Sequence, residues 1–206
     1  MPTAKLSHRP TRSTWTKTRR KRGSAPIGMP EPLDPTKGAN KRITVSVDAM
    51  GGDMGPAAVV AGIAKAAAQN SDISFLVFGP EAELKQLVQK RRLSDRCQVR
   101  DVSEVVRMDD KPSHVMRHGK GTSMWAAIDA VKEGEAQAVV SCGNTGALMA
   151  VSMIRLRKLP GIFRPAIACL WPSRNPGGFN VMLDVGADIR ADAKDLLQYA
   201  LMGASY

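Results

Sequence analysis

Two short loops of the sequence combine glycines with polar side chains in a way that suits the binding of an anion. Residues 48–56 read DAMGGDMGP, and residues 141–146 read SCGNTG. Each loop follows an apolar stretch typical of a strand and precedes a stretch with helical periodicity. Glycines allow the backbone to approach a ligand closely, and the first turn of the next helix offers free N–H groups. Such loops suit phosphate, although tight turns without a ligand have the same composition.

A third loop, Asp184-Val185-Gly186-Ala187-Asp188, has the same character. Because the carboxyl ends of parallel strands meet at one edge of a sheet, we expect the three loops to lie together there. Their glycine spacing matches neither G-x-G-x-x-G nor a Walker P-loop, so the usual nucleotide sites are not predicted. No serine lies in a G-x-S-x-G elbow; Ser123 and Ser141 are candidates for binding a phosphate oxygen, and nothing activates them as nucleophiles.

A basic segment at residues 117–124, RHGKGTSM, is a further candidate for anion binding. It offers two fixed cations, two glycines, and Thr122 or Ser123 as the N-cap of a helix. A solvated basic loop is the alternative. His114 and His118 are spaced as in an H-E-x-x-H zinc helix, but Val115 occupies the position of the required glutamate. We therefore predict no metal site.

The elements that would position these loops alternate along the chain. Apolar strands are expected at residues 43–50, 73–79, 97–102, 136–143, 167–171 and 179–184. Helices are expected at 57–69, 81–90, 124–133, 145–158 and 191–204, with a short helix inside the polar stretch 103–121. Strands that alternate with helices of this length are typical of parallel β-α-β units whose sheet is covered on both faces. The predicted fold is an open α/β sandwich.

The net charge of +11 is concentrated near the start of the sequence. Residues 1–42 hold 11 Lys or Arg and two acidic residues, a net of +9, which leaves +2 for residues 43–206. Since residues 1–42 lack apolar periodicity, we interpret them as a basic disordered extension. The alternatives are a transit peptide, a later start of translation at Met29 or near Ile43, and a basic run that touches nucleic acid or anionic lipid.

The cysteines Cys97, Cys142 and Cys169 are widely spaced and form no C-x-x-C pair. This usage disfavours a disulfide framework or a zinc cluster and suits a reducing cytoplasm. We expect each cysteine to be a small buried apolar residue. No apolar stretch approaches the roughly 20 residues of a membrane span.

Five segments, in their order and spacing, resemble the bacterial phosphate acyltransferase family, often called PlsX. They read VDAMGGDMGP, GTSMWAAI, VVSCGNTGALM, RPAIA, and LDVGAD with QYALMGA. The resemblance covers about residues 43–206. It implies a three-layer α/β/α sandwich with a mostly parallel sheet, related to the phosphotransacetylases and to the isocitrate and isopropylmalate dehydrogenase fold. It also implies a homodimer and no cofactor.

The activity that this resemblance implies is transfer of a long acyl group from acyl carrier protein to inorganic phosphate. The acyl phosphate would then feed a membrane glycerol-3-phosphate acyltransferase in phospholipid biosynthesis. A cytoplasmic enzyme, loosely attached to the membrane and without a nucleic-acid partner, is therefore expected.

The site residues can be carried over only for the part of the family that the chain covers. Asp48 and Asp184 are expected to orient the loops from strand ends, and a purely structural clamp on glycine-loop N–H groups is the alternative. The family continues well beyond Tyr206, and the resemblance places its catalytic lysine and asparagine there, so no catalytic residue is predicted. The expected lining of the phosphate pocket is Gly51, Gly52, Asp53, Ser123, Gly143, Asn144, Thr145 and Gly146.

Two hypotheses of other classes stay open. In the first, the chain is a catalytically incomplete fragment that serves as a binding or oligomerisation module. In the second, its basic extension binds nucleic acid or membrane surfaces. Strong loss of binding with salt and on deletion of residues 1–42 would mark the second. Only Trp15 lies near those charges as an aromatic platform, which disfavours it.

Overall fold

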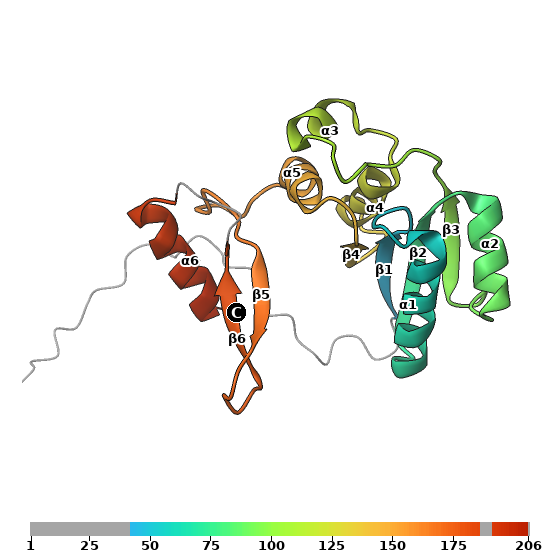
Figure 1. The fold of residues 1–206 in the computed structure, drawn as a ribbon, viewed down its shortest axis with the longest axis horizontal. Helices are drawn as coiled ribbons and strands as arrows, with labels where there is room; N and C mark the ends of the chain where they lie inside the picture. Colours follow the sequence, from blue (N-terminus) through green and yellow to red (C-terminus); the bar gives the residue numbers. More distant parts are fainter. Residues whose placement is uncertain (1–41, 186–190, 206) are drawn as a thin grey trace, which may run out of the picture. The chain divides into compact units, whose positions relative to one another are not determined.

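The structure, a computed structural model, describes residues 42–185 and 191–205. Residues 1–41 of the predicted extension, and Gly186 to Asp188 of the third loop, lie outside these ranges. The elements follow the predicted order (Figure 1). They are β1 (Ile43–Asp48), α1 (Gly55–Gln69), β2 (Ile73–Gly79), α2 (Glu81–Lys90), β3 (Cys97–Asp101), α3 (Pro112–His118), α4 (Ser123–Lys132), β4 (Ala138–Ser141), α5 (Thr145–Arg155), β5 (Ala168–Pro172), β6 (Phe179–Leu183) and α6 (Ala193–Ser205).

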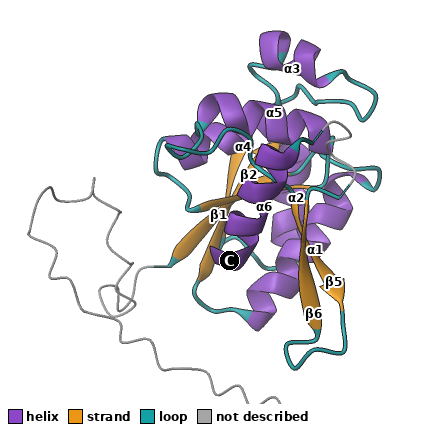
Figure 2. Ribbon diagram, turned by 90° about the vertical axis from the view of Figure 1, so that its left-hand side faces the viewer, coloured by secondary structure: helices purple, strands orange, loops and turns teal. Residues whose placement is uncertain are grey.

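Four of the strands form one parallel sheet in the order β3-β2-β1-β4. Side chains of β2 alternate between its faces. Phe75 and Val77 pack in a core with α1 and α2, whereas Leu76 and Phe78 pack in a core with α4. Helices thus cover both faces, as the continuous apolar run of β2 requires (Figure 2). The predicted α/β fold with a parallel sheet is confirmed.

The chain reverses its direction across the sheet after β3. From β1 it proceeds to β2 and β3 on one side, and then crosses to β4 on the other side of β1. Asp48, the last residue of β1, lies opposite Ser141, the last residue of β4. Ligands of open α/β sheets bind outside the carboxyl ends of the strands at such a reversal. The first two glycine loops leave the sheet at this point.

Side-chain caps fix the starts of two helices beside this reversal, α4 and α5. The Thr122 hydroxyl accepts a hydrogen bond from the Trp125 N–H at 3.4 Å and begins α4. The Asn144 side chain accepts one from the Ala147 N–H at 3.0 Å and begins α5. Each cap satisfies one of the N–H groups that a helix leaves without an internal acceptor.

The last two strands form a separate antiparallel sheet. They are joined by a turn at residues 173–178, and α6 packs on β6. So short a connection makes a hairpin, because a parallel pair needs a crossover of about a dozen residues or more. The expectation that all three loops share one sheet edge is therefore wrong for the third, since Asp184 follows β6 and not a strand of the four-stranded sheet.

Some predicted boundaries shift by a few residues. The helix expected at 145–158 ends at Arg155, and the left-handed φ of 66° at Arg157 prevents its continuation. The strand expected at 136–143 is confined to 138–141. Within the described ranges, no helix is long and apolar enough to cross a membrane.

The core between the sheet and α2 gives a first test. Leu84 is fully buried in α2, whereas Leu196 of α6 is 60% exposed. We expect Leu84→Ala to lower the free energy of unfolding by about 2–5 kcal/mol, because the lost contacts leave a cavity. The matched change Leu196→Ala should stay within about 0.5 kcal/mol. Urea unfolding monitored by circular dichroism measures both, and equal midpoints for the two variants would contradict this core.

Candidate functional site

The side chain of Asp48 is the meeting point of four segments at the carboxyl edge of the sheet. Its Oδ1 accepts hydrogen bonds from the Ser123 hydroxyl at 2.6 Å, the Met50 N–H at 3.1 Å and the Gly51 N–H at 3.2 Å. Its Oδ2 accepts one from the Ser141 hydroxyl at 2.7 Å. The carboxylate therefore ties the start of α4, the end of β4 and the first glycine loop to β1.

These donors explain how a carboxylate can lie in the interior. Asp48 is only 2% exposed, and an ionised group removed from water is stable only when hydrogen bonds replace its hydration. Four donors do so here. A serine hydroxyl has a single proton, so those of Ser123 and Ser141 are already donated to Asp48. Ser123 is fully buried and contacts Asp48 instead of open space.

Glycine at position 51 is required by close packing between the two loops. A Cβ there would lie 2.7 Å from the Asp48 Oδ2 and 2.8 Å from the Gly143 nitrogen. At Gly52, φ is +97°, and a Cβ would lie 3.1 Å from that of Cys142. The structure thus brings together two loops that are about ninety residues apart in sequence, as predicted from their positions at strand ends.

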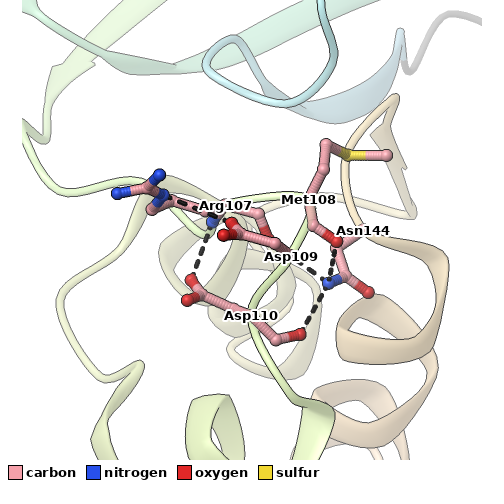
Figure 3. Close-up of polar contacts among 5 residues, drawn as sticks. All are labelled: Arg107, Met108, Asp109, Asp110 and Asn144. Carbon is pink, nitrogen blue, oxygen red and sulfur yellow. Dashed lines mark hydrogen bonds and ion pairs between the residues drawn. The ribbon is translucent and has the colours of Figure 1, made fainter.

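Asn144 holds a third segment against the start of α5. Figure 3 shows its amide nitrogen directed at the backbone of residues 107–110. It donates to the carbonyl oxygens of Arg107 at 3.2 Å, Met108 at 3.1 Å and Asp110 at 2.9 Å. The same side chain caps α5 through its oxygen. Asn144 is 8% exposed, and its polar atoms are all engaged within the protein.

The first turn of α5 offers backbone donors to the site. Thr145 is exposed and Gly146 is half-buried, while the Ala147 N–H is taken by the Asn144 cap. The N–H groups of Thr145 and Gly146 have no acceptor within the helix, and the helix dipole favours a negative charge there. Gly143 is buried, and its N–H donates to the Ser141 hydroxyl at 3.1 Å. Asp53 is exposed in the first loop.

The basic segment at residues 117–124 is less suited to an anion than its sequence suggests. Thr122 is the N-cap of α4 and donates its hydroxyl proton to the Gly119 carbonyl oxygen at 2.7 Å. The Ser123 N–H donates to the Glu104 carbonyl oxygen at 2.9 Å. The polar groups of this segment thus bond within the protein, and its cations Arg117 and Lys120 are exposed.

The two histidines of the described chain lie together on α3, with ring centroids 4.7 Å apart. They line a cavity of about 300 Å³ with Glu104 and Asp110. Among the described residues, however, no three His, Cys, Asp or Glu side chains are grouped so that they could hold a metal ion.

Asp184 and the cysteines complete the predicted residues. Asp184 is 8% exposed with a left-handed φ of 55°, and its N–H donates to the Ile167 carbonyl oxygen at 2.7 Å, so it belongs to the second sheet. The expectation of buried cysteines is wrong for Cys142 and Cys169, which are exposed because each lies at or in a strand with an uncovered face. Burial raises the pKa of the half-buried Cys97 thiol to about 11.

Comparison with known proteins shows the family to which the chain belongs. A family model described as "Fatty acid synthesis protein" matches residues 43–206. The chain belongs to this family. The resemblance drawn from the five sequence segments is confirmed by relatives that carry the name phosphate acyltransferase.

Three such relatives of the fatty acid synthesis protein family come from Ruegeria sp. (strain TM1040), Paracoccus denitrificans (strain Pd 1222) and Dinoroseobacter shibae (strain DSM 16493). The first is 68% identical over 173 residues, which make up 84% of this chain and 46% of the relative. The second is 69% identical over 165 residues, 80% of this chain and 45% of the relative. The third is 66% identical over 185 residues, 89% of this chain and 48% of the relative. The chain spans about half the length of these curated relatives.

Sequence reasoning foresaw the glycine loops of this family member but missed two contacts that hold them. From the sequence, Ser123 and Ser141 are candidates for binding a phosphate oxygen, whereas in the structure both hydroxyls donate to Asp48. Asn144 is predicted to line the pocket, and the sequence did not indicate that its amide nitrogen donates to the backbone of residues 107–110. The sequence signal for these contacts was Asp48, a charged residue at the end of an apolar strand, because a buried carboxylate requires hydrogen-bond donors.

The Asp48 cluster predicts a graded loss of stability. Asp48→Ala leaves two hydroxyl and two N–H donors without their acceptor, so we expect the free energy of unfolding to fall by about 3 kcal/mol or more. Asp48→Asn keeps one acceptor oxygen and should lose less. Asp53→Ala, at an exposed carboxylate of the same loop, is the control and should change little. Urea unfolding measures all three. Equal stability of the Asp48→Ala and Asp53→Ala proteins would show that the cluster is not structural.

The Asn144 contacts make a less obvious prediction. Aspartate is as good an N-cap as asparagine, so Asn144→Asp would be harmless if capping were the only role. Because a carboxylate cannot donate to three carbonyl oxygens and repels them, we expect Asn144→Asp to destabilise the protein by about 2 kcal/mol, at least as much as Asn144→Ala. Thermal unfolding of the two variants decides the matter. Wild-type stability of the aspartate variant would mean that the clamp on residues 107–110 contributes nothing.

Proposed function

We propose that the chain is the N-terminal part of a phosphate acyltransferase, which transfers a long acyl group from acyl carrier protein to inorganic phosphate in phospholipid biosynthesis. The family membership and the names of the relatives support this proposal. The observation that carries it is the arrangement at the sheet reversal, where two glycine loops and the free N–H groups of α5 meet. Such an arrangement suits a phosphate ion.

The reaction makes clear demands on such a site. A phosphate oxygen attacks the thioester carbonyl carbon, a C–O bond forms, the C–S bond breaks, and a proton reaches the leaving thiolate. The protein must therefore strip phosphate of part of its water, hold it near the thioester, and offer donors to the oxyanion. Backbone N–H groups are suited to this because they carry no charge that would bind phosphate too tightly.

We propose distinct roles for the residues around the reversal. The N–H groups of Thr145 and Gly146, and the hydroxyl of Thr145, bind phosphate. Gly51, Gly52 and Gly143 let the two loops come close enough to enclose it.

The buried members of the set act behind this lining. Asp48 and Ser123 position the loops, and Asn144 fixes the start of α5. Asp53 is the member least suited to touch phosphate, because its exposed carboxylate carries the same sign of charge. The proposal assigns the group that protonates the leaving thiolate to the part of the relatives that this chain does not match.

The wider setting is part of the same proposal. Acyl carrier protein delivers the acyl group, and a membrane glycerol-3-phosphate acyltransferase takes up the acyl phosphate. An enzyme that links a carrier protein with a membrane enzyme would work in the cytoplasm at or near the membrane surface. We include a homodimer, as the resemblance implies.

A second candidate is supported by a specific observation. The second sheet and α6 expose large apolar side chains, among them Leu170, Trp171, Leu196 and Leu201, which are 54–61% exposed. Apolar patches of this kind mark interaction surfaces. The chain would then act as a binding or oligomerisation module that completes another polypeptide.

The test uses a substitution that separates phosphate binding from folding. Thr145→Asp places a negative charge at the start of α5, where the helix dipole tolerates or favours it. We expect the KM for phosphate to rise at least tenfold, with thermal stability unchanged. Thr145→Ser keeps the hydroxyl and adds no charge, so this control should stay within about threefold of wild type. The assay measures free thiol released from acyl carrier protein and acyl phosphate formed.

Three outcomes of that assay are informative. A phosphate KM that does not change in the Thr145→Asp protein would contradict the placement of phosphate at α5. If this chain shows no turnover but binds phosphate by calorimetry, and the Thr145→Asp protein does not, the phosphate site is supported and the chain is an incomplete enzyme. Neither turnover nor phosphate binding would favour the module.

A further inference from the structure

A groove of about 470 Å³ runs along one face of the four-stranded sheet, between α1 and the edge strand β4. Its walls are almost entirely apolar. Strand residues Val45, Val47 and Val140 form one side, and Ala58, Gly62 and Ala66 of α1 contribute to the other. Its volume lies within the range of about 300–1,000 Å³ that ligand pockets have.

The groove exists because no helix of the described residues covers β4 on this face. Val140 lies opposite Val47 in the sheet, and the two side chains point to the same side. Val47 is buried by the core of α1 and α2, whereas Val140 remains 49% exposed. On α1, a Cβ added at Gly62 would meet no atom within 4 Å. The open space is thus framed by a sheet and a helix that are both firmly packed elsewhere.

One end of the groove reaches the first glycine loop. Gly51, Gly52, Asp53 and Cys142 line it there, next to the sheet reversal where phosphate is proposed to bind. Asp53 is the only charged residue among the described residues that line it, and the other end is apolar, with Phe75 and Ala66. A ligand that fits has a polar head at the loop and an alkyl tail along α1.

We propose that this groove holds the alkyl chain of the acyl thioester, with the carbonyl carbon at the glycine loop beside Cys142. The inference rests on the proposed function, because the name of the relatives supplies the acyl group and the site at α5 supplies phosphate. Each buried methylene of the chain then strengthens binding about fourfold, so affinity depends steeply on chain length.

Cys142 provides a direct probe of occupancy in the full 206-residue chain. The probes are S-butyl and S-dodecyl pantetheine, thioethers that resemble the acyl donor but cannot transfer an acyl group. The rate of iodoacetamide alkylation of Cys142 is measured at pH 8 by peptide mass spectrometry. The exposed Cys169, outside the groove, is the reference within the same molecule. Cys97 does not interfere, because its pKa of about 11 keeps its thiol protonated at this pH.

We expect S-dodecyl pantetheine to slow alkylation of Cys142 at least fivefold relative to Cys169, and S-butyl pantetheine at the same concentration to have no effect. Gly62→Leu fills the groove and should abolish the protection. The substitution favours the helix, because leucine is a better helix former than glycine. Ala68→Leu, on α1 but outside the groove, is the matched control and should keep it. Ala66→Leu serves as a second filled variant if circular dichroism shows that Gly62→Leu does not fold.

Four results would overturn the proposal. They are no protection of the wild-type protein, equal protection of Cys169, protection that survives in the filled variants, and alkylation of Cys142 that slows with protein concentration alone. The last would mean that a second copy occupies the groove. The labelling needs no phosphate and no acyl transfer. Protection without acyl phosphate formation would therefore support the alkyl groove but not the proposed reaction of this chain. Acyl phosphate formation without protection would support the reaction and contradict the groove.

Discussion

A buried carboxylate at the end of the first strand is the interaction on which the rest of the site depends. Asp48 cannot lie in the interior without donors, and the fold brings them from α4, from β4 and from the loop that follows Asp48 itself. Each of these segments is therefore fixed with respect to β1. The same contacts leave the backbone N–H groups of α5, and not the serine hydroxyls, as the donors available to an anion. A negative side chain thus organises a site that suits a negative ligand without touching it.

The reversal of the chain across the sheet determines where the two glycine loops meet, and the glycines allow their backbones to approach closely. The order β3-β2-β1-β4 puts two loops beside each other, and Gly51 lets them approach to a separation that no side chain would permit. Asn144 then adds residues 107–110 as a third wall. On the α1 face, the uncovered strand β4 leaves an apolar groove that starts at the same loops. The proposed phosphate site and the proposed alkyl groove consequently meet at these loops.

The helices, the strands and the first two glycine loops could be predicted from the sequence, because each depends on a local pattern of residues. The apolar run ISFLVFG predicts a buried strand, and the glycines after β1 and β4 predict turns at one sheet edge. The sequence could not predict which of several distant groups a side chain contacts. Nothing local to Ser123 indicates that its hydroxyl meets Asp48, 75 residues earlier. The third loop was misplaced because strand order was assumed from alternation, while the short turn after β5 dictates a hairpin.

The pairing of β1 with β4 also has a consequence for how the protein folds. Asp48 and Ser141 are 93 residues apart, so the chain must close a long loop before their contact can form. Pairs β1–β2 and β2–β3 need much shorter closures and can form early on the ribosome, while β4 is still being synthesised. Until β4 arrives, the inner edge of β1 is an open template for other strands. The residues that complete the site therefore also end the time for which this edge of β1 is unpaired.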